Sequence, residues 1–367
     1  MIGFSNLQNT ICINPFLMAR RMGAVAQGGG SVTAQRLGEL IDGLETPGIK
    51  GKTELPVTCL ITDSRRVVPG AVFFAIDGHQ TSGMKYVVEA ASRGAVAIVS
   101  QAARPSGVSQ VTWVQVPHTR RALAEISQRF YRHPESHLDI FGVTGTNGKT
   151  TVATLLQYFL RADGMPAGLI GTVSYDLGKR TLPAYRTTPE SVELYAMFEQ
   201  MREAGCKAAV MEISSHAIDQ DRIYGLPVKV AAFTNLSQDH LDYHGTLEEY
   251  FETKVGLFTG KSGRAPEKAV INSDDAHGKI LIGRLSQDTQ VITFGTNADA
   301  QVRAENITLS AQGSEFDCIW PQGRARVRTA LPGLYNVHNI LTALGMLYAG
   351  GLDVQKAIGA LERFPGV

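Results

Sequence analysis

Hydrophobic residues in the first third of the chain fall into short runs separated by segments with helical spacing. Apolar runs typical of buried strands lie at 57–61, 71–76, 95–100 and 111–116. Helical patterns lie at 35–44, 84–93 and 119–131. This alternation predicts a small α/β domain over residues 35–135. The polar segment 132–135 ends it, because Pro134 cannot continue the preceding helix.

The same alternation resumes after residue 136 on a larger scale. Strands are predicted at 138–145, 208–213, 228–235, 268–272 and 290–295. Helices are predicted at 150–162, 190–204, 246–258, 275–285, 335–350 and 353–362, and antiparallel strands over 300–331. We therefore predict a second α/β domain over 136–362, with a mostly parallel sheet covered by helices on both faces. Ligands of such sheets bind at the carboxyl ends of the strands.

The ends of the chain do not follow this pattern. Residues 1–34 contain Gly28, Gly29 and Gly30 and lack a continuous apolar stretch, so we expect a flexible extension. A targeting segment remains the alternative for this region. Residues 363–367 are similar to the start of a linker.

Composition narrows the possible partners. The 35 Lys and Arg residues nearly balance the 34 Asp and Glu residues, which argues against bulk nucleic-acid binding. No run of 18 apolar residues is present, so no membrane helix is expected. The scattered Cys12, Cys59, Cys206 and Cys318 are typical of reduced thiols. We expect a cytoplasmic monomer.

The strongest chemical signal is the segment GVTGTNGKTT at 142–151, between a predicted strand and a predicted helix. Its glycines allow backbone N–H groups to surround phosphate oxygens. Lys149 is expected to reach the outer phosphates of ATP, and the Thr150 hydroxyl is expected to bind Mg²⁺. Val143 stands where the strict phosphate-loop pattern has glycine. The candidate ATP-binding residues here are Gly145, Thr146, Asn147, Gly148, Lys149, Thr150 and Thr151.

Polar residues follow two further predicted strands. Glu212 ends one strand, where it is either a metal-binding carboxylate or a solvated one. His240 and His244 have i,i+4 spacing, but no third zinc ligand is nearby, so a zinc site is not expected. From the residues alone, Lys254 is an ordinary solvated helix lysine.

The variant TGTNGKTT resembles the ATP-dependent Mur ligases, which build the peptide stem of peptidoglycan, and the related folylpolyglutamate synthases. The resemblance covers residues 35–366. The segments DSR (63–65), GHQ (78–80) and NLSQDHLDYHG (235–245) are most similar to the branch that adds the third residue of the stem. The resemblance implies a UDP-sugar domain, a phosphate-loop ATPase-type central domain, and a third, C-terminal domain that this chain lacks.

The resemblance also implies roles for individual residues. Lys149 would be catalytic, and Glu212 and His240 would bind Mg²⁺. Lys254 would be carbamylated by CO₂ to form an anion that positions a second Mg²⁺. The segment around Asn336 and Asn339 would contact adenine, although Asn336 is also a candidate helix N-cap. The UDP-sugar would be bound by Thr62, Ser64, His79, Gln80 and Thr81, and its peptide end by Thr187, Thr188, Ser214, Gln220 and Arg222.

The reaction implied by the resemblance joins UDP-MurNAc-L-Ala-D-Glu to a diamino acid, meso-diaminopimelate or L-lysine, with hydrolysis of ATP. An acyl phosphate would be the intermediate. Two alternatives remain open. One is a catalytically silent module that binds the nucleotide or the UDP-sugar, and the other is a different ligase of the Mur or folylpolyglutamate synthase type.

Overall fold

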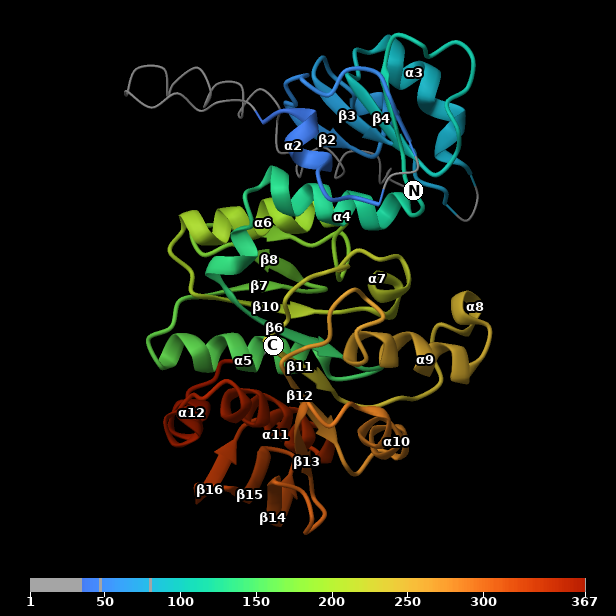
Figure 1. The fold of residues 1–367 in the computed structure, drawn as a ribbon. Helices are drawn as coiled ribbons and strands as arrows, with labels where there is room; N and C mark the ends of the chain where they lie inside the picture. Colours follow the sequence, from blue (N-terminus) through green and yellow to red (C-terminus); the bar gives the residue numbers. More distant parts are fainter. Residues whose placement is uncertain (1–34, 46–47, 79–80, 367) are drawn as a thin grey trace, which may run out of the picture. The chain divides into compact units, whose positions relative to one another are not determined.

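The computed structural model describes residues 35–45, 48–78 and 81–366. The expectations for residues 1–34 and for His79 and Gln80 lie outside these residues. The chain divides into two compact units, one up to Ala122 and one from Leu123 onward (Figure 1). This division falls within helix α4 (Thr119–Phe130), upstream of the boundary expected at 132–135. The domain limits inferred from the sequence therefore stay predictions.

The first unit is built on a five-stranded sheet in the order β1-β5-β4-β3-β2. Strands β2 to β5 are parallel, and β1 pairs antiparallel with β5. The strands are β1 (Gly48–Lys50), β2 (Cys59–Ile61), β3 (Ala71–Phe74), β4 (Ala97–Ser100) and β5 (Thr112–Gln115). The helical elements are α2 (Leu37–Ile41), η3 (Ser64–Arg66), η4 (Gly83–Tyr86) and α3 (Val87–Ser92).

The second unit contains an eleven-stranded sheet in the order β16-β15-β14-β13-β12-β11-β6-β10-β7-β8-β9. Its centre, from β14 to β7, is parallel, and each end is antiparallel. The parallel strands are β6 (Asp139–Thr144), β7 (Ala167–Ile170), β10 (Ala208–Glu212), β11 (Val230–Phe233), β12 (Lys268–Asn272), β13 (Gln290–Gly295) and β14 (Val302–Ser310). The remaining strands are β8 (Ser174–Asp176), β9 (Thr181–Pro183), β15 (Gly313–Trp320) and β16 (Gly323–Thr329).

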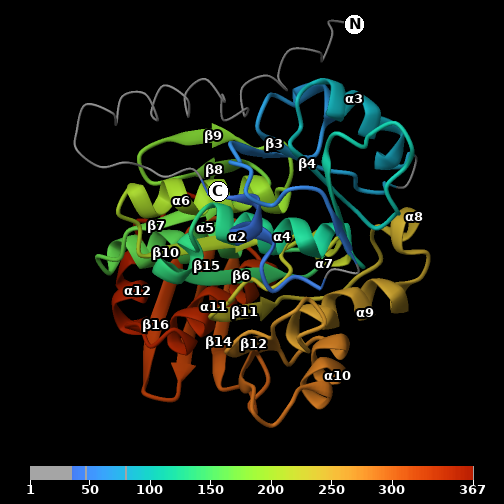
Figure 2. The same cartoon turned by 45° about the horizontal axis from the view of Figure 1, so that its top comes forward.

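Helices cover both faces of this sheet, as Figures 1 and 2 show. On one face α5 (Lys149–Ala162) packs beside α11 (Leu334–Ala349) and α12 (Val354–Leu361). On the other face, Met201 of α6 (Ser191–Glu203) lies against Gly168 of β7, and Phe251 of α9 (Leu247–Phe258) contacts Phe233 of β11. The other helical elements are η5 (Pro134–His137), α7 (Ser215–Asp219), α8 (Leu241–His244) and α10 (Ala276–Arg284).

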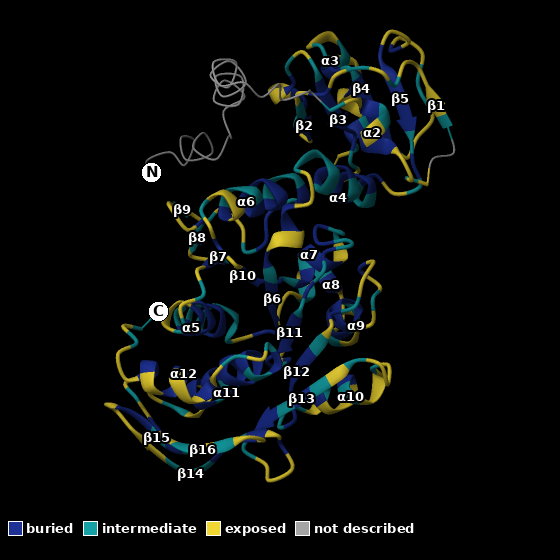
Figure 3. Ribbon diagram, turned by 60° about the vertical axis from the view of Figure 1, so that its left-hand side comes forward, coloured by how far each residue is buried: buried dark blue, intermediate teal, exposed yellow. Residues whose placement is uncertain are grey.

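The central strands are buried on both faces, which is why they appear in the sequence as continuous apolar runs. In β10, Ala208 and Val210 join the core beneath α5 and α11, whereas Ala209 and Met211 point to the opposite layer. Figure 3 shows the resulting band of buried residues along these strands. This packing leaves the carboxyl ends of the strands as the place where polar groups can meet.

Most of the elements expected from the sequence are confirmed, including the mostly parallel sheet and the antiparallel strands near residue 300. The helix expected at 84–93 begins with the 3₁₀ turn η4 and continues as α3. Strands β1, β7, β8 and β9 and the short helices α7 and α8 were not predicted. None of the described helices is long and apolar enough to cross a membrane, and the three described cysteines are free.

Leu156 of α5 is fully buried in the core of the second unit, so its truncation tests this packing. We expect Leu156→Ala to lower the free energy of unfolding by about 2–5 kcal/mol, through lost transfer energy and a residual cavity. The control Val173→Ala, at a side chain that is 70% exposed, should change it by less than about 0.5 kcal/mol.

The measurement is urea unfolding followed by tryptophan fluorescence. The chain has two tryptophans, Trp113 in the first unit and Trp320 in the second. In a Trp113→Phe background the signal therefore reports the second unit. Equal midpoints for Leu156→Ala and Val173→Ala would contradict the packing.

Candidate active site

The loop between β6 and α5 adopts a conformation that requires glycine at two positions. Gly145 has φ 144° and Gly148 has φ 88°, both in the region that side chains disfavour. A Cβ atom on Gly145 would lie 2.0 Å from Thr234 Oγ1, and one on Gly148 would lie 2.3 Å from Asn339 Oδ1. The loop can therefore pack this closely only with glycine.

The segment after β11 holds this loop in place. Asn235 accepts from the N–H of Thr146 through its backbone carbonyl (2.9 Å) and from the N–H of Asn147 through its side-chain oxygen (3.0 Å). Thr234 Oγ1 donates to the carbonyl of Asn147 (2.6 Å), and the N–H of Ser237 donates to Thr146 Oγ1 (3.0 Å). The sequence did not predict this supporting role for Asn235 and Ser237.

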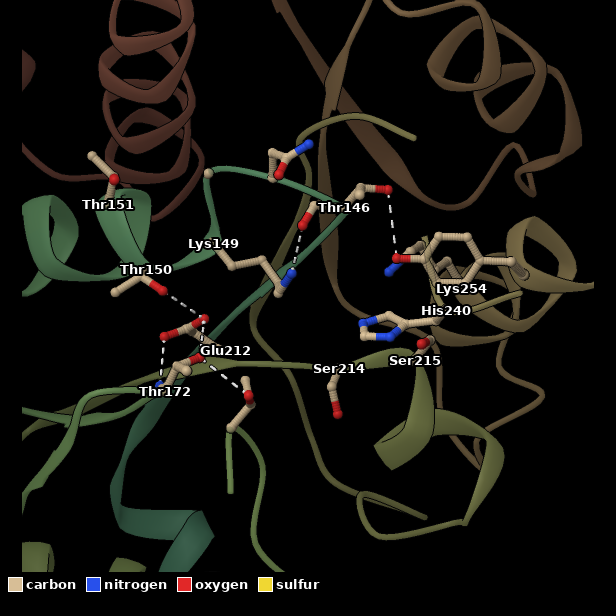
Figure 4. A pocket seen from close by; sticks show the side chains of 14 residues that line it. Thr146, Lys149, Thr150, Thr151, Thr172, Glu212, Ser214, Ser215, His240 and Lys254 are labelled. Atoms are coloured by element: carbon tan, nitrogen blue, oxygen red, sulfur yellow. Dashed lines mark hydrogen bonds between the residues drawn. The ribbon is translucent and has the colours of Figure 1, made fainter. Parts of the chain in front are cut away.

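The start of α5 opens into a cavity of about 350 Å³ at the carboxyl ends of the strands (Figure 4). The N-cap of this 14-residue helix is Gly148, which has no side chain to cap the first turn. Its N–H groups and the positive end of its dipole thus make this wall attractive for an anion. The cavity is lined by Thr146, Asn147, Gly148, Lys149, Thr150, Thr151, Thr172, Thr187, Glu212, Ser214, Ser215, His240, Tyr250 and Lys254.

Glu212, at the end of β10, is the carboxylate of this cavity and is only 1% exposed. Its Oε2 accepts from Thr150 Oγ1 (3.0 Å) and from Thr172 Oγ1 (3.0 Å). Its Oε1 accepts from the N–H of Thr172 (2.8 Å). The alternative of a solvated carboxylate is therefore wrong. Thr172 was not predicted, because the strand before it was not recognised.

Two lysines converge on a single carbonyl oxygen. Lys149 Nζ and Lys254 Nζ each donate to the oxygen of Gly145 at 3.0 Å, and Lys149 also donates to the carbonyl of Thr146 (2.8 Å). Lys254 is 1% exposed and its ammonium lies over the ring of Tyr250. The interpretation of Lys254 as a solvated helix lysine is therefore wrong.

Burial and repulsion act together on these two ammonium groups. Burial, followed by the charge of Lys149, holds the pKa of Lys254 well below its usual value, although Asp239 opposes this shift. Burial also lowers the pKa of Lys149, against the attraction of Glu212 and Asp239. Lys254 is the more strongly affected of the two. The site therefore favours its neutral amine.

His240 lies on the opposite side of the cavity from Glu212, beside Lys254 (Figure 4). It has a left-handed backbone, with φ 52°, and its ring contacts those of His216 and Tyr250. His244, the other member of the i,i+4 pair, is hydrogen-bonded to Ser215 Oγ (2.9 Å). Among the described residues there is no cluster of three or more His, Cys, Asp or Glu side chains that could hold a metal.

Four of the residues expected to hold the peptide end, namely Thr188, Ser214, Gln220 and Arg222, form one hydrogen-bonded group. Thr187 and Ser214 line the cavity. Thr188 is fully buried behind them, with its hydroxyl donating to the carbonyl of Glu212 (2.8 Å). Arg222 donates to the carbonyl of Thr188 (2.8 Å) and to the side chain of Gln220 (2.7 Å).

These contacts distinguish two kinds of candidate. Thr187 and Ser214 present side chains to the cavity, whereas Thr188 and Arg222 hold the surrounding segments in place. Arg222 is also paired with Glu190 (3.1 Å between Nε and Oε1). A substrate carboxylate at Arg222 would therefore compete with Glu190. The roles of all these residues in binding stay predictions.

In the first unit, Ser64 is buried and its hydroxyl donates to Glu89 Oε2 (2.7 Å). Thr62 and Thr81 are exposed. The described geometry therefore leaves Thr62 and Thr81 accessible to a ligand, while Ser64 already has one partner. Their role in UDP-sugar binding stays a prediction.

A second cavity of about 550 Å³ shares Asn147 and Gly148 with the first. It is also lined by Tyr335, which is 67% exposed, and by His338 and Asn339 of α11. The other residues lining it are Thr234, Asn235, Asn272, Asp274, Asp275 and Thr342. The phosphate loop thus forms a wall common to both cavities.

Asn336 does not line this second cavity. Its side chain donates to the carbonyl of Pro332 (2.9 Å) and accepts from Asn339 Nδ2 (3.2 Å). The N-cap of α11 is Gly333, so the alternative that Asn336 caps the helix is wrong. Asn339 faces the cavity, and Asn336 supports it from behind.

The lowered pKa of Lys254 predicts a pH-dependent cost to stability. Between its pKa in the folded protein and its value of 10.5 in the unfolded chain, the unfolded state binds the extra proton, so wild-type stability rises with pH. In CO₂-free buffer, Lys254→Met should therefore be more stable than wild type by an amount that shrinks as pH approaches 10.5. Chemical unfolding over a pH series measures this difference.

The matched control for this prediction is Lys279→Met, at an exposed lysine of α10. Its stability difference from wild type should not vary in this way with pH. A stability difference for Lys254→Met that is independent of pH would contradict the lowered pKa.

Comparisons with known proteins agree with this geometry. The family description "Mur ligase middle domain" matches residues 143–347, and "Mur ligase family, catalytic domain" matches residues 56–131. The chain is 39% identical to a UDP-N-acetylmuramoyl-L-alanyl-D-glutamate--2,6-diaminopimelate ligase of Solibacter usitatus, over 90% of this chain and 67% of the relative. It is 42% identical to the ligase of the same name from Geobacillus kaustophilus, over 84% of this chain and 64% of the relative.

Solved structures extend the comparison. A structure of a ligase with the same name as these relatives superposes with a TM-score of 0.78 at 29% identity, covering 91% of this chain and 67% of the other. MurF from Acinetobacter baumannii shares the fold at 20% identity, with a TM-score of 0.65 over 92% of this chain and 70% of the other. The chain spans about two thirds of the length of the relatives that it matches. From the matched domains, the identity to these relatives and the shared fold, we conclude that the chain belongs to the Mur ligase family.

Proposed function

We propose that this protein takes part in peptidoglycan precursor synthesis as an ATP-dependent ligase that joins a diamino acid to UDP-MurNAc-L-Ala-D-Glu. One observation carries the proposal: a phosphate loop, the buried carboxylate of Glu212, the buried Lys254 and the half-buried Lys149 line the same cavity. The relatives named as 2,6-diaminopimelate ligases support this choice of substrates. They also favour 2,6-diaminopimelate over L-lysine as the diamino acid.

The two cavities suit the two ends of ATP. The first-turn N–H groups of α5 and Lys149 offer donors to the outer phosphates. The second cavity offers the exposed Tyr335 ring and the Asn339 side chain to the base. Because Asn147 and Gly148 line both cavities, a single nucleotide could run from one to the other along the phosphate loop.

The donor set in the first cavity suits Mg²⁺. Thr150 Oγ1 and Glu212 Oε2 are oxygen ligands 3.0 Å apart, and magnesium sites commonly combine one or two carboxylates with substrate phosphates. Bound Mg²⁺ would neutralise charge on the phosphates during their transfer. We propose Thr150 and Glu212 as the residues that would hold it, and His240, across the cavity beside Lys254, as a ligand of a second Mg²⁺. A carbamate on Lys254 would supply a further oxygen ligand.

The surroundings of Lys254 support carbamylation. Only a neutral amine attacks CO₂, and burial together with the charge of Lys149 favours that form of Lys254. The new C–N bond forms as the amine loses a proton, which leaves an N-carboxylate. Repulsion between two ammonium groups is thereby replaced by attraction between Lys149 and an anion.

The proposed reaction has two steps. An oxygen of the D-Glu γ-carboxylate attacks the γ-phosphorus of ATP, the bond to ADP breaks, and an acyl phosphate forms. The amine of the diamino acid then attacks the acyl carbon, loses a proton, and phosphate leaves. Lys149 would leave the carbonyls of Gly145 and Thr146 for the more negative phosphate oxygens, where its charge stabilises the transition state.

The expected cytoplasmic location and monomeric state stay predictions.

Binding measurements on the 367-residue chain test this function. By calorimetry, we expect binding of MgATP and of UDP-MurNAc-L-Ala-D-Glu. Lys149→Ala should weaken MgATP binding at least about tenfold, because charge-assisted hydrogen bonds are lost. The same change should leave affinity for the UDP-dipeptide within about twofold, and Lys279→Ala serves as the control for both ligands.

Two results would refute the proposed function. A wild-type chain that binds neither ligand would remove it altogether. A chain that binds MgATP and a folate but not the UDP-dipeptide would favour a folylpolyglutamate synthase instead.

Carbamylation of Lys254 has its own test by NMR with ¹³CO₂. We expect one slowly exchanging carbamate resonance at neutral pH in wild type, and its loss in Lys254→Ala. Lys229→Ala removes a lysine that is paired with Asp139 and should keep the resonance. A spectrum of wild type without a protein carbamate signal would exclude the modification under these conditions.

A further inference from the structure

The turn after β7 is built around the carboxylate of Glu212. Ile170, the last residue of β7, pairs with Met211 of β10, so residues 171 and 172 lie beside the end of β10. A Cβ atom on Gly171 would lie 2.6 Å from Glu212 Oε1. A side chain there would displace the carboxylate from its present position beside the backbone of the next residue.

Thr172 bonds both oxygens of this carboxylate. Its N–H donates to Oε1 (2.8 Å) and its hydroxyl donates to Oε2 (3.0 Å). Thr150 of the phosphate loop approaches the same Oε2 from the other side (3.0 Å), as Figure 4 shows. The orientation of Glu212 is therefore set by Thr172 on one side and by the phosphate loop on the other.

The hydroxyl of Thr172 also meets that of Thr187, at an Oγ1–Oγ1 distance of 3.1 Å. A carboxylate only accepts, so the single hydroxyl proton of Thr172 is used on Glu212. Thr187 must then be the donor in the bond between the two hydroxyls. Thr187 lines the cavity, and what it can still offer there is a lone pair rather than a proton.

We propose that Thr172 is a positioning residue for the ligase reaction. This role rests on the proposed function, and Thr172 would act in two ways. Thr172 orients the Glu212 carboxylate toward the Mg²⁺ of MgATP, and by accepting from Thr187 it turns that hydroxyl into an acceptor for an N–H group of the UDP-dipeptide. A hydrogen-bonded series Thr187–Thr172–Glu212–Thr150 thus connects the side that holds the peptide to the side that holds the phosphates.

The four side chains of this series come from four separate segments of the chain. Thr150 comes from α5, Thr172 from the turn after β7, Thr187 from the segment before α6, and Glu212 from β10. Each partner in the series is a threonine except the carboxylate. Short hydroxyl side chains with few rotamers hold such a network at a low cost in conformational entropy.

Calorimetry with ATP, in the presence and absence of Mg²⁺, tests the first of these two actions. Thr172→Val keeps the shape of the side chain and the backbone N–H but removes the hydroxyl, and should reduce the Mg²⁺-dependent gain in ATP affinity about tenfold. ATP affinity without Mg²⁺ should stay within about twofold of wild type. A general structural defect would instead lower ATP affinity whether or not Mg²⁺ is present. Thr172→Ser restores the hydroxyl and should bind MgATP within about twofold of wild type.

The control is Thr259→Val, at a hydroxyl that bonds the carbonyl of Val255 at the end of α9. It should leave both ATP affinities unchanged. Thermal unfolding of each variant shows whether it folds, and Thr172→Ala replaces Thr172→Val if the latter does not.

The second action is tested with the UDP-dipeptide. Thr187→Val should weaken UDP-MurNAc-L-Ala-D-Glu about tenfold while leaving the Mg²⁺-dependent gain in ATP affinity within about twofold, because the bonds from Thr172 to Glu212 remain. Thr187→Ser should bind both ligands as wild type does. Unchanged UDP-dipeptide affinity in Thr187→Val would overturn the acceptor role of Thr187.

Failure of the inference and failure of the proposed function give different results. A wild-type chain that binds neither MgATP nor the UDP-dipeptide refutes the function itself. A wild-type chain that binds both, with a Thr172→Val variant that keeps the full Mg²⁺-dependent gain, refutes only the role of Thr172. A Thr172→Ser variant as impaired as Thr172→Val would also refute it, since the hydroxyl would then not be the cause.

Discussion

The site depends on the carbonyl oxygen of Gly145, which accepts hydrogen bonds from both Lys149 and Lys254. Bringing two ammonium groups to one oxygen where one of them, that of Lys254, is buried is costly unless one of them loses its proton or an anion joins them. The structure places the greater shift on Lys254, whose pKa is lowered by burial and by Lys149. The cavity is therefore predisposed to receive negative charge, either as phosphate or as a carboxylate on Lys254.

This arrangement follows from the order of the central strands. In the strand order β11-β6-β10-β7, the ends of four strands are neighbours. They are followed or occupied, in that order, by Asn235, which supports the phosphate loop, by the phosphate loop itself, by Glu212 and by Thr172. Because these strands are parallel, their carboxyl ends meet at one edge of the sheet. Glycine at 145 and 171 then lets backbone approach within hydrogen-bonding distance of its partners. Residues more than 60 positions apart in the chain thus act on the same few atoms.

Most strands of the two sheets and the position of the phosphate loop could be predicted from the sequence. Continuous apolar runs identified the parallel strands of both units except β7 and β14; β14 was expected among antiparallel strands but also pairs parallel with β13. The glycine-rich segment before α5 identified the phosphate loop without any relative. The roles of Glu212 and Lys254 could not be inferred from local pattern, because a strand-end carboxylate and a helix lysine are usually solvated. Their burial arises from tertiary packing, and only the family resemblance pointed to it in advance.

Other features left no usable sequence signal. The run at 167–170 is short and contains glycine, so it does not resemble a strand, and Thr172 was missed with it. Asn235 supports the phosphate loop through its backbone carbonyl and its side chain, and the backbone contact could be made by any residue. The antiparallel additions β8 and β9 have three residues each, too few to show a period of two.

The most direct test of the central claim is a crystal structure of the 367-residue chain grown with ADP, Mg²⁺, bicarbonate and UDP-MurNAc-L-Ala-D-Glu. The account predicts phosphates at the first turn of α5, adenine in the cavity lined by Tyr335 and Asn339, and density for a carboxyl group on Lys254. It also predicts that Lys149 leaves the carbonyl of Gly145. Nucleotide bound away from the phosphate loop, with both lysines still on Gly145, would contradict it.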